Sequence, residues 1–202
     1  MNFRNKTMIV SVVAALGLLV AGCSSKPASH KTTSKSTNTS TPLKNLDSVV
    51  GNHYMFTSEF YGKAAKDVKS IAWKKITPEY SLAFTSKTKA YVGHYQKKQL
   101  TGLKVYQVTT AKKGYFKFQQ AAYITTEANY AHLSAEVKQT YVKVAANKVP
   151  GAAKGTTYYQ STKQNISKTP VYYRFYTDGK ALIRQNAPKN NKYYYSKNTL
   201  SN

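Results

Sequence analysis

Several short stretches of the chain alternate apolar and polar residues, the pattern of strands that bury one face. Residues 103–110, LKVYQVTT, are rich in β-branched and aromatic side chains, and YFKFQ at 115–119 follows after a short turn at 111–114. We expect these two stretches to be neighbouring antiparallel strands. The shorter apolar stretches at 54–56 and 192–196 predict one further strand each.

A second hairpin is predicted nearer the C-terminus. Residues 171–177 form a β-rich stretch, Asp178-Gly179 is a favoured two-residue turn, and 180–185 is the partner strand. This turn type needs positive φ at both central positions, which Gly allows and Asp tolerates.

One stretch has helical rather than strand spacing. Leu133, Val137, Tyr141 and Val144 recur at intervals of four, four and three residues, which places them on one helical face. Ser134 can cap the helix and Pro150-Gly151 can end it. The sequence therefore predicts one amphipathic helix near 134–148.

These patterns together predict a mainly β fold, with α+β as the alternative. Residues 45–202 are long enough for one domain with a real core, or for two very small ones. We expect a small antiparallel barrel or SH3-like sheets.

The N-terminal pattern is different. Arg4 and Lys6 precede thirteen uncharged residues, 8–20, which is the length of an export signal and too short to span a membrane well. Leu19-Val20-Ala21-Gly22-Cys23 then resembles the bacterial lipobox. The resemblance implies cleavage between Gly22 and Cys23 and a diacylglycerol on the Cys23 thiol, hence a lipid anchor on the outer face of the bacterial cell membrane.

The segment after Cys23 has the composition of a linker. Ser24 to Lys44 contains six Ser and five Thr among twenty-one residues, with very few apolar side chains. Such a segment buries too little surface to offset its ordering entropy. We expect 23–44 to be a flexible linker between the lipid and an extracellular domain at 45–202.

A second resemblance covers residues 88–125. Lys104-Val105-Tyr106-Gln107-Val108, Gly114-Tyr115-Phe116-Lys117-Phe118 and Tyr123-Ile124 are similar to the strands of bacterial SH3-like wall-associated modules. The usual Gly-Trp-Val before the last strand is replaced by Gln119-Gln120-Ala121-Ala122. The resemblance implies an SH3-like module at 80–125.

The charge narrows the choice of partner. The chain has 31 Lys and Arg against 7 Asp and Glu, a net charge of +24, and only three of the basic residues are arginines. Loss of residues 1–22 would leave about +22. Lysine is a hydrated point charge that suits diffuse attraction to a polyanion. Beyond the membrane the polyanions are lipid head groups and wall polymers, so we expect no nucleic-acid partner; simple solvation of the surface is the alternative.

The sequence shows no recognisable catalytic or metal motif. His30, His53, His94 and His132 are scattered, without the spacing of metal ligands. Ser86-Lys87-Thr88-Lys89 fits the S-x-x-K pattern of penicillin-interacting enzymes but lacks their companion motifs, and chance explains it better. We expect a protein that is not an enzyme and that has no cofactor or metal.

What remains is a binding role. Tyrosine rings beside lysines can contact the apolar face of a sugar and its charged groups. We expect the ligand-binding residues among Tyr172, Tyr176, Tyr193, Tyr195 and Lys192, on a surface that binds anionic wall polymers or glycans. The alternative is a β-barrel module that holds a small apolar or peptide ligand.

Overall fold

The computed structural model describes residues 40–163 and 166–201. The expected signal peptide at 1–22, the lipobox with Gly22 and Cys23, and most of the expected linker at 23–44 lie outside the described residues. The strands are β1 (His53–Gly62), β2 (Lys74–Lys75), β3 (Tyr80–Ser86), β4 (Lys89–Gln96), β5 (Gln99–Thr110), β6 (Phe116–Thr126), β7 (Tyr141–Val144), β8 (Tyr158–Ser161), β9 (Val171–Asp178), β10 (Ala181–Asn186) and β11 (Tyr193–Leu200). The helical turns are α1 (Glu127–Ala131), α2 (Ala135–Lys138) and the 3₁₀ turns η1 (Asp47–Val49), η2 (Val68–Ser70), η3 (Lys112–Gly114) and η4 (Ala146–Lys148).

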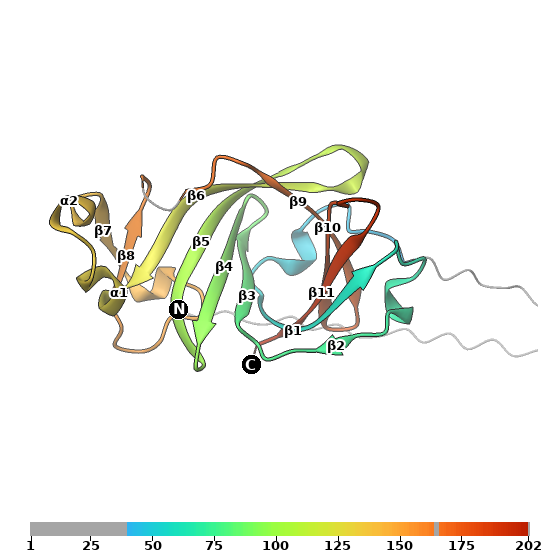
Figure 1. The fold of residues 1–202 in the computed structure, drawn as a ribbon, viewed down its shortest axis with the longest axis horizontal. Helices are drawn as coiled ribbons and strands as arrows, with labels where there is room; N and C mark the ends of the chain where they lie inside the picture. The colour runs from blue at the N-terminus through green and yellow to red at the C-terminus, as the bar shows by residue number, and fades with distance from the viewer. Residues whose placement is uncertain (1–39, 164–165, 202) are drawn as a thin grey trace, which may run out of the picture. The chain divides into compact units, whose positions relative to one another are not determined.

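Eight of the strands form a closed ring of antiparallel pairings. Strands β1, β3, β4, β5, β6, β9, β10 and β11 each pair with the next, and β11 pairs back onto β1. Figure 1 shows β3, β4 and β5 side by side in this arrangement. The mainly β fold predicted from the sequence is confirmed. The described residues belong to one compact unit.

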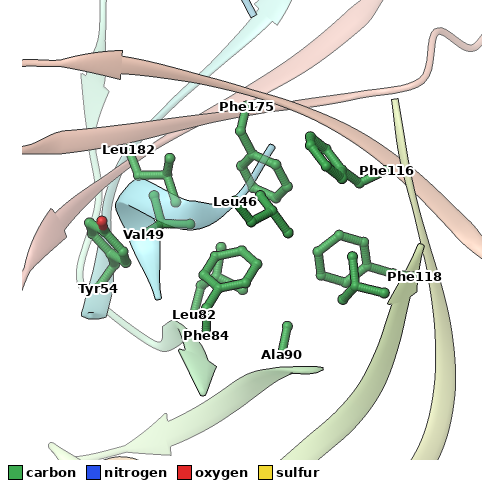
Figure 2. Packing of buried hydrophobic residues seen from close by; sticks show 11 residues of the cluster. Leu46, Val49, Tyr54, Leu82, Phe84, Ala90, Phe116, Phe118, Phe175 and Leu182 are labelled. Carbon is green, nitrogen blue, oxygen red and sulfur yellow. The ribbon is translucent and has the colours of Figure 1, made fainter. Parts of the chain in front are cut away.

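The interior of one half of the ring is filled by a core that includes the entering chain. Leu46, the residue just before η1, and Val49 of η1 lie inside, against side chains from seven strands (Figure 2). We call this the ring core: Leu46, Val49, Tyr54, Leu82, Phe84, Ala90, Val108, Phe116, Phe118, Phe175 and Leu182. Phe175 contacts the rings of Phe84 and Phe118 at centroid distances of 5.6 and 5.9 Å. The 3₁₀ turn η1 therefore plugs this half of the ring.

Two further clusters lie on the outer face of the ring. One, the outer cluster, places Tyr158 of β8 and Val149 against the outer residues of β3 to β6. The other, the tyrosine cluster, consists of Val68, Ile71, Tyr176, Ile183 and Tyr195. Several strands thus bury both faces, with a different cluster on each.

The predicted helix near 134–148 is wrong beyond its first turn. Ser134 caps α2, since its Oγ accepts a hydrogen bond from the Val137 amide at 3.3 Å, but α2 ends at Lys138. The chain then becomes β7, in which Tyr141 to Val144 pair with β8. A short isolated helix is marginal, and β-branched valines favour a ladder once a partner strand is present. Figure 1 shows α1 and α2 next to this β7–β8 pair.

The stretch at 88–125 forms strands as expected, but as part of the larger ring. Strands β4, β5 and β6 are consecutive in it, with β3 on one side and β8 and β9 on the other. The residues in place of the Gly-Trp-Val motif do not end a strand: β6 runs through them with a bulge, where Val105 pairs with Ala122 and Tyr106 pairs with Gln120. Residues 80–125 therefore do not close a separate small barrel.

The predicted C-terminal hairpin is present with its turn shifted by one residue. Asp178 pairs with Ala181, so that Gly179 and Lys180 form the loop. Gly179 has φ +57°, whereas Asp178 is an extended strand residue and is not among the described residues with positive φ. The shift lets the Asp178 carboxylate accept a hydrogen bond from Lys197 Nζ at 2.9 Å.

The folded unit begins earlier than the predicted boundary at residue 45. The amide of Leu43 donates to the Phe175 carbonyl at 2.7 Å, and its side chain packs on the ring core. Ser40 Oγ accepts a hydrogen bond from the Val68 amide at 3.2 Å. Leu43, the apolar exception in a Ser/Thr-rich stretch, explains why this part of the expected linker is ordered.

Within the part of the chain that the structure describes, the helices are too short to cross a bilayer.

Candidate functional site

The ring core fills only part of the ring, and a cavity of about 490 Å³ lies beyond it. We call this the ring cavity. Its lining residues come from all eight ring strands and are Phe56, Tyr80, Ser81, Leu82, Val92, His94, Gly102, Lys104, Tyr106, Tyr123, Tyr173, Arg184, Tyr194 and Asn198. Because side chains alternate along each strand, these positions, apart from Ser81, continue the inward-facing rows that form the ring core. Leu82 belongs to both.

Aromatic rings form the floor and walls of the ring cavity. Tyr106 and Tyr173 both pack edge-on against Phe118 of the ring core, at centroid distances of 5.7 and 5.0 Å. On the other side, Phe56 and Tyr194 form an edge-on pair at 6.4 Å. These contacts hold the rings in fixed positions, so that the cavity is largely preformed.

A cation lies among these rings. The guanidinium carbon of Arg184 is 4.9 Å from the centroid of the Tyr173 ring and 5.9 Å from that of Phe56. Its Nε atom is buried and has no hydrogen-bond partner in the described residues. Lys104, on β5, is a second lining cation and is exposed.

Two of the lining tyrosines have strongly shifted acidities. Burial, and then the neighbouring Tyr173, raise the pKa of Tyr106 to about 12, although the charge of Arg184 opposes this shift. Burial also raises the pKa of Tyr194 to about 12, together with the hydrogen bond that its hydroxyl donates to Glu59 Oε2 at 3.1 Å. Both hydroxyls are therefore protonated and neutral near neutral pH.

The remaining wall depends on a close approach between β5 and β6. A Cβ at Gly102 would clash with the hydroxyl of Tyr123, so glycine leaves room for that ring. His94 is held by Thr101, whose Oγ1 lies 3.1 Å from the imidazole Nδ1, and its ring lies 5.1 Å from that of Tyr80. This end of the cavity therefore combines aromatic surface with hydrogen-bonding groups.

A larger and more open hollow, the outer groove, lies next to the ring cavity and shares His94 with it. It is about 970 Å³ and is lined by His53, Met55, Thr77, Pro78, Glu79, His94, Tyr95, Gln96, Lys97, Lys98, Gly151, Ala152 and Ser201. Burial lowers the pKa of His53, so this histidine favours its neutral form. In residues 40–163 and 166–201, no three His, Cys, Asp or Glu side chains form a group that could hold a metal ion.

Two of the predicted ligand-binding tyrosines are buried, and that part of the prediction is wrong. Tyr195 is 1% exposed and Tyr176 is also buried, both within the tyrosine cluster. Gln185 lies between them: its Oε1 accepts from the Tyr176 hydroxyl at 2.9 Å and its Nε2 donates to the Tyr195 hydroxyl at 2.7 Å. A buried glutamine thus satisfies both hydroxyls, which lets the rings serve as core.

The other predicted positions lie at the surface. Tyr172 is 39% exposed and lines a shallow hollow of about 440 Å³, the tyrosine–lysine hollow, together with Ala111, Lys112, Tyr115, Lys117 and Ala187. Tyr193 is half-buried, and the exposed Lys192 places its Nζ 5.6 Å from the ring centroid of Tyr61. The structure therefore does not bring the five predicted residues together into one site.

The S-x-x-K segment is a hairpin and has no helical geometry. Ser86 and Lys89 are directly paired across the turn between β3 and β4, whereas Lys87 Nζ contacts Asp47 Oδ1 at 2.6 Å. The arrangement required by penicillin-interacting enzymes, one helical turn between serine and lysine, is absent from this segment.

Comparison of the chain with known protein families, with characterised proteins and with solved structures found no match. What the site can do therefore has to be argued from its own geometry. An aromatic cavity that is partly open to solvent and has one inward cation is suited to holding a small molecule. The tyrosine–lysine hollow is suited to weaker surface contacts.

Proposed function

We propose that this chain is a binding protein that holds a small, largely apolar ligand in the ring cavity. The observation that supports this best is the cavity itself: six aromatic side chains surround about 490 Å³ inside a ring of strands. Rings of eight strands have interiors that can hold one small ligand, and ligand sites commonly have volumes of 300–1,000 Å³ with a mainly apolar lining.

The cavity-filling variant Val92→Trp tests this proposal. Val92 is half-buried and lines the cavity, so an indole there would occupy the space of the ligand. Full-length protein is titrated with the neutral fluorescent probe phenylnaphthylamine. We expect the variant to bind at least about tenfold more weakly, a loss of about 1.4 kcal/mol.

Val142→Trp is the matched control, because Val142 is 63% exposed on β7 and does not line the cavity. It should bind the probe as the unchanged protein does, and measuring all three in the same detergent removes the contribution of micelles. Equal probe affinity in Val92→Trp and Val142→Trp would contradict the proposal.

We further propose that the protein is held at the outer face of a bacterial membrane by lipid on Cys23. The support is the lipobox pattern at 19–23 together with the charged and apolar segments before it. Mass spectrometry of the full-length product should find diacylglycerol on Cys23, and Cys23→Ser should release the protein from the membrane fraction. An unmodified thiol in the membrane-bound product would argue against the anchor.

The outer surface supports a second candidate role, association with anionic wall polymers. Only three ion pairs form among the described residues, with Lys74, Lys87 and Lys197, so most lysines have no acidic partner. The tyrosine–lysine hollow around Tyr172 adds a ring for sugar contact. Pull-down with purified wall polymer should weaken as salt increases, because exposed charges are screened beyond about 10 Å at 0.1 M.

Tyr172→Ala in that hollow should weaken the pull-down further, whereas Tyr61→Ala should not. Tyr61 is also an exposed tyrosine, at 60%, but it lies outside the hollow. Binding that is independent of salt and of Tyr172 would exclude this role.

A further inference from the structure

Arg184 is a charged residue that faces inward on β10, a strand whose other side chains are mostly buried. On β10, Leu182 points into the ring core and Ile183 into the tyrosine cluster. Arg184 follows on the Leu182 face and lines the ring cavity. A charged residue at such a position is costly unless it is paired.

The described residues provide no counter-charge for Arg184. None of their three ion pairs involves it, and its buried Nε has no hydrogen-bond partner. No carboxylate from residues 40–163 or 166–201 lines the ring cavity. Glu59 contacts one lining residue, Tyr194, whose hydroxyl donates a hydrogen bond to it. The same carboxylate forms an ion pair with Lys74.

Arg184 instead contacts the faces of aromatic rings. These contacts hold the guanidinium in place but provide no hydrogen-bond acceptors for its N–H groups. It stacks over Tyr173 and approaches Phe56. The planar fork of arginine matches the two oxygens of a carboxylate, sulfonate or phosphate, and this chain has only three arginines among 31 basic residues. An arginine at this inward position is therefore notable in a chain whose basic residues are nearly all lysine.

We propose that the ligand of the ring cavity is a small amphipathic anion. Its oxyanion group is bound by Arg184, with Lys104 adding positive charge, and its apolar or aromatic body lies among the rings of Phe56, Tyr106 and Tyr173. This inference deepens the proposed function and depends on the ring cavity being the binding site. It adds the sign of the ligand's charge and the residue that recognises it.

A pair of probes that differ only in one anionic group tests this. Phenylnaphthylamine is neutral, and anilinonaphthalene sulfonate is the same ring system with a sulfonate. Full-length protein should bind the sulfonate at least about tenfold more tightly, because hydrogen bonds between charged groups are stronger than those between neutral groups. Equal affinity for the two probes overturns the inference.

Arg184→Gln should abolish this preference, measured within the variant as the ratio of its affinities for the two probes. Arg174→Gln is the matched control: it removes the same charge from β9, where Arg174 is bonded to the Lys113 carbonyl outside the cavity. This control should keep the preference. The same loss in both variants would mean that net charge, rather than Arg184, attracts the sulfonate, and would overturn the inference.

Arg184→Lys covers the case in which glutamine at this position prevents folding. Lysine keeps the charge but lacks the planar fork, so the ratio of the two affinities within this variant should be smaller than in the unchanged protein. An undiminished preference in Arg184→Lys would contradict recognition by the fork.

Two further measurements separate failure of this inference from failure of the proposed function. If the neutral probe binds in the ring cavity and the sulfonate binds no better, only the anion inference fails. If neither probe is sensitive to Val92→Trp, both fail. Inorganic phosphate should displace the bound sulfonate probe far less well than naphthoate does. Equal displacement by the two anions would indicate a site that recognises only negative charge, and would contradict an amphipathic ligand.

Discussion

At the scale of single residues, the two half-buried tyrosines Tyr106 and Tyr194 report on the ring cavity. Both residues line the cavity, and burial is the largest cause that raises the pKa of each. Since a phenolate is disfavoured in such surroundings, their ionisation measures how apolar the cavity is.

We expect two tyrosines to titrate near pH 12 in an absorbance titration of the folded protein. Unfolded tyrosine ionises near pH 10, so between these values the unfolded state loses protons first. The stabilising contribution of the neutral phenols is complete below about pH 10 and is lost as pH rises towards 12. Tyr106→Phe should remove one of the two late transitions; an unchanged titration curve would contradict this assignment.

Phe175 is a fully buried residue of the ring core. Its ring contacts those of Phe84, Phe116 and Phe118, at centroid distances between 5.6 and 5.9 Å. Phe175→Ala should lower the free energy of unfolding by about 3–5 kcal/mol, measured by chemical denaturation, because neighbouring rings cannot fill the space. The exposed control Val142→Ala should change it by no more than about 0.5 kcal/mol.

At the scale of elements, the C-terminal hairpin shows how a turn sets register. Gly179 occupies the first loop position with φ +57°, and an added Cβ there would meet no atom within 4 Å. The need for glycine is therefore conformational and not a matter of space.

Gly179→Ala should destabilise the protein by about 1 kcal/mol, the cost of a left-handed backbone for an L-residue. Lys180→Ala, the other residue of the same loop, should have little effect, since its φ is not positive. Denaturation of both variants measures the difference. An equal effect of the two changes would show that the turn is not held in this conformation.

The strands can be predicted from the sequence because the alternation of apolar and polar residues is local. Features that depend on pairing with a distant strand cannot be predicted in this way. Tyr141–Val144 has helical spacing to Val137, yet β8 supplies the ladder that makes it a strand. Local sequence does not single out Arg184, because a charged strand residue usually faces water; the signal for it is its position two residues after Leu182, on the same face. Tyr106 and Tyr173 lie on strands far apart in sequence, and only ring closure brings them together.

At the scale of the whole molecule, charge opposes folding. The net charge is +24, and the described ion pairs involve only Asp47, Glu59 and Asp178 as acids. Such an excess of like charge destabilises the compact state through self-repulsion. Most of this charge is lysine, which keeps its head in water.

We therefore expect the free energy of unfolding to increase when sodium chloride is raised from very low to physiological concentration. Screening shortens the range of the repulsion from about 30 Å at 0.01 M to about 8 Å. Chemical denaturation with urea, which is uncharged, measures this without adding salt. A decrease in stability over this range would indicate that the few ion pairs outweigh the repulsion.

The pairing of the first ring strand with the last also has a consequence for biosynthesis. Strand β1 bonds to β11 along nearly its whole length, from Tyr54–Leu200 to Gly62–Tyr193. The circle cannot be completed until the ribosome has released the final residues of β11. A growing chain thus keeps the ring open until β11 has been made, so the ring core stays accessible to solvent until every ring strand is present.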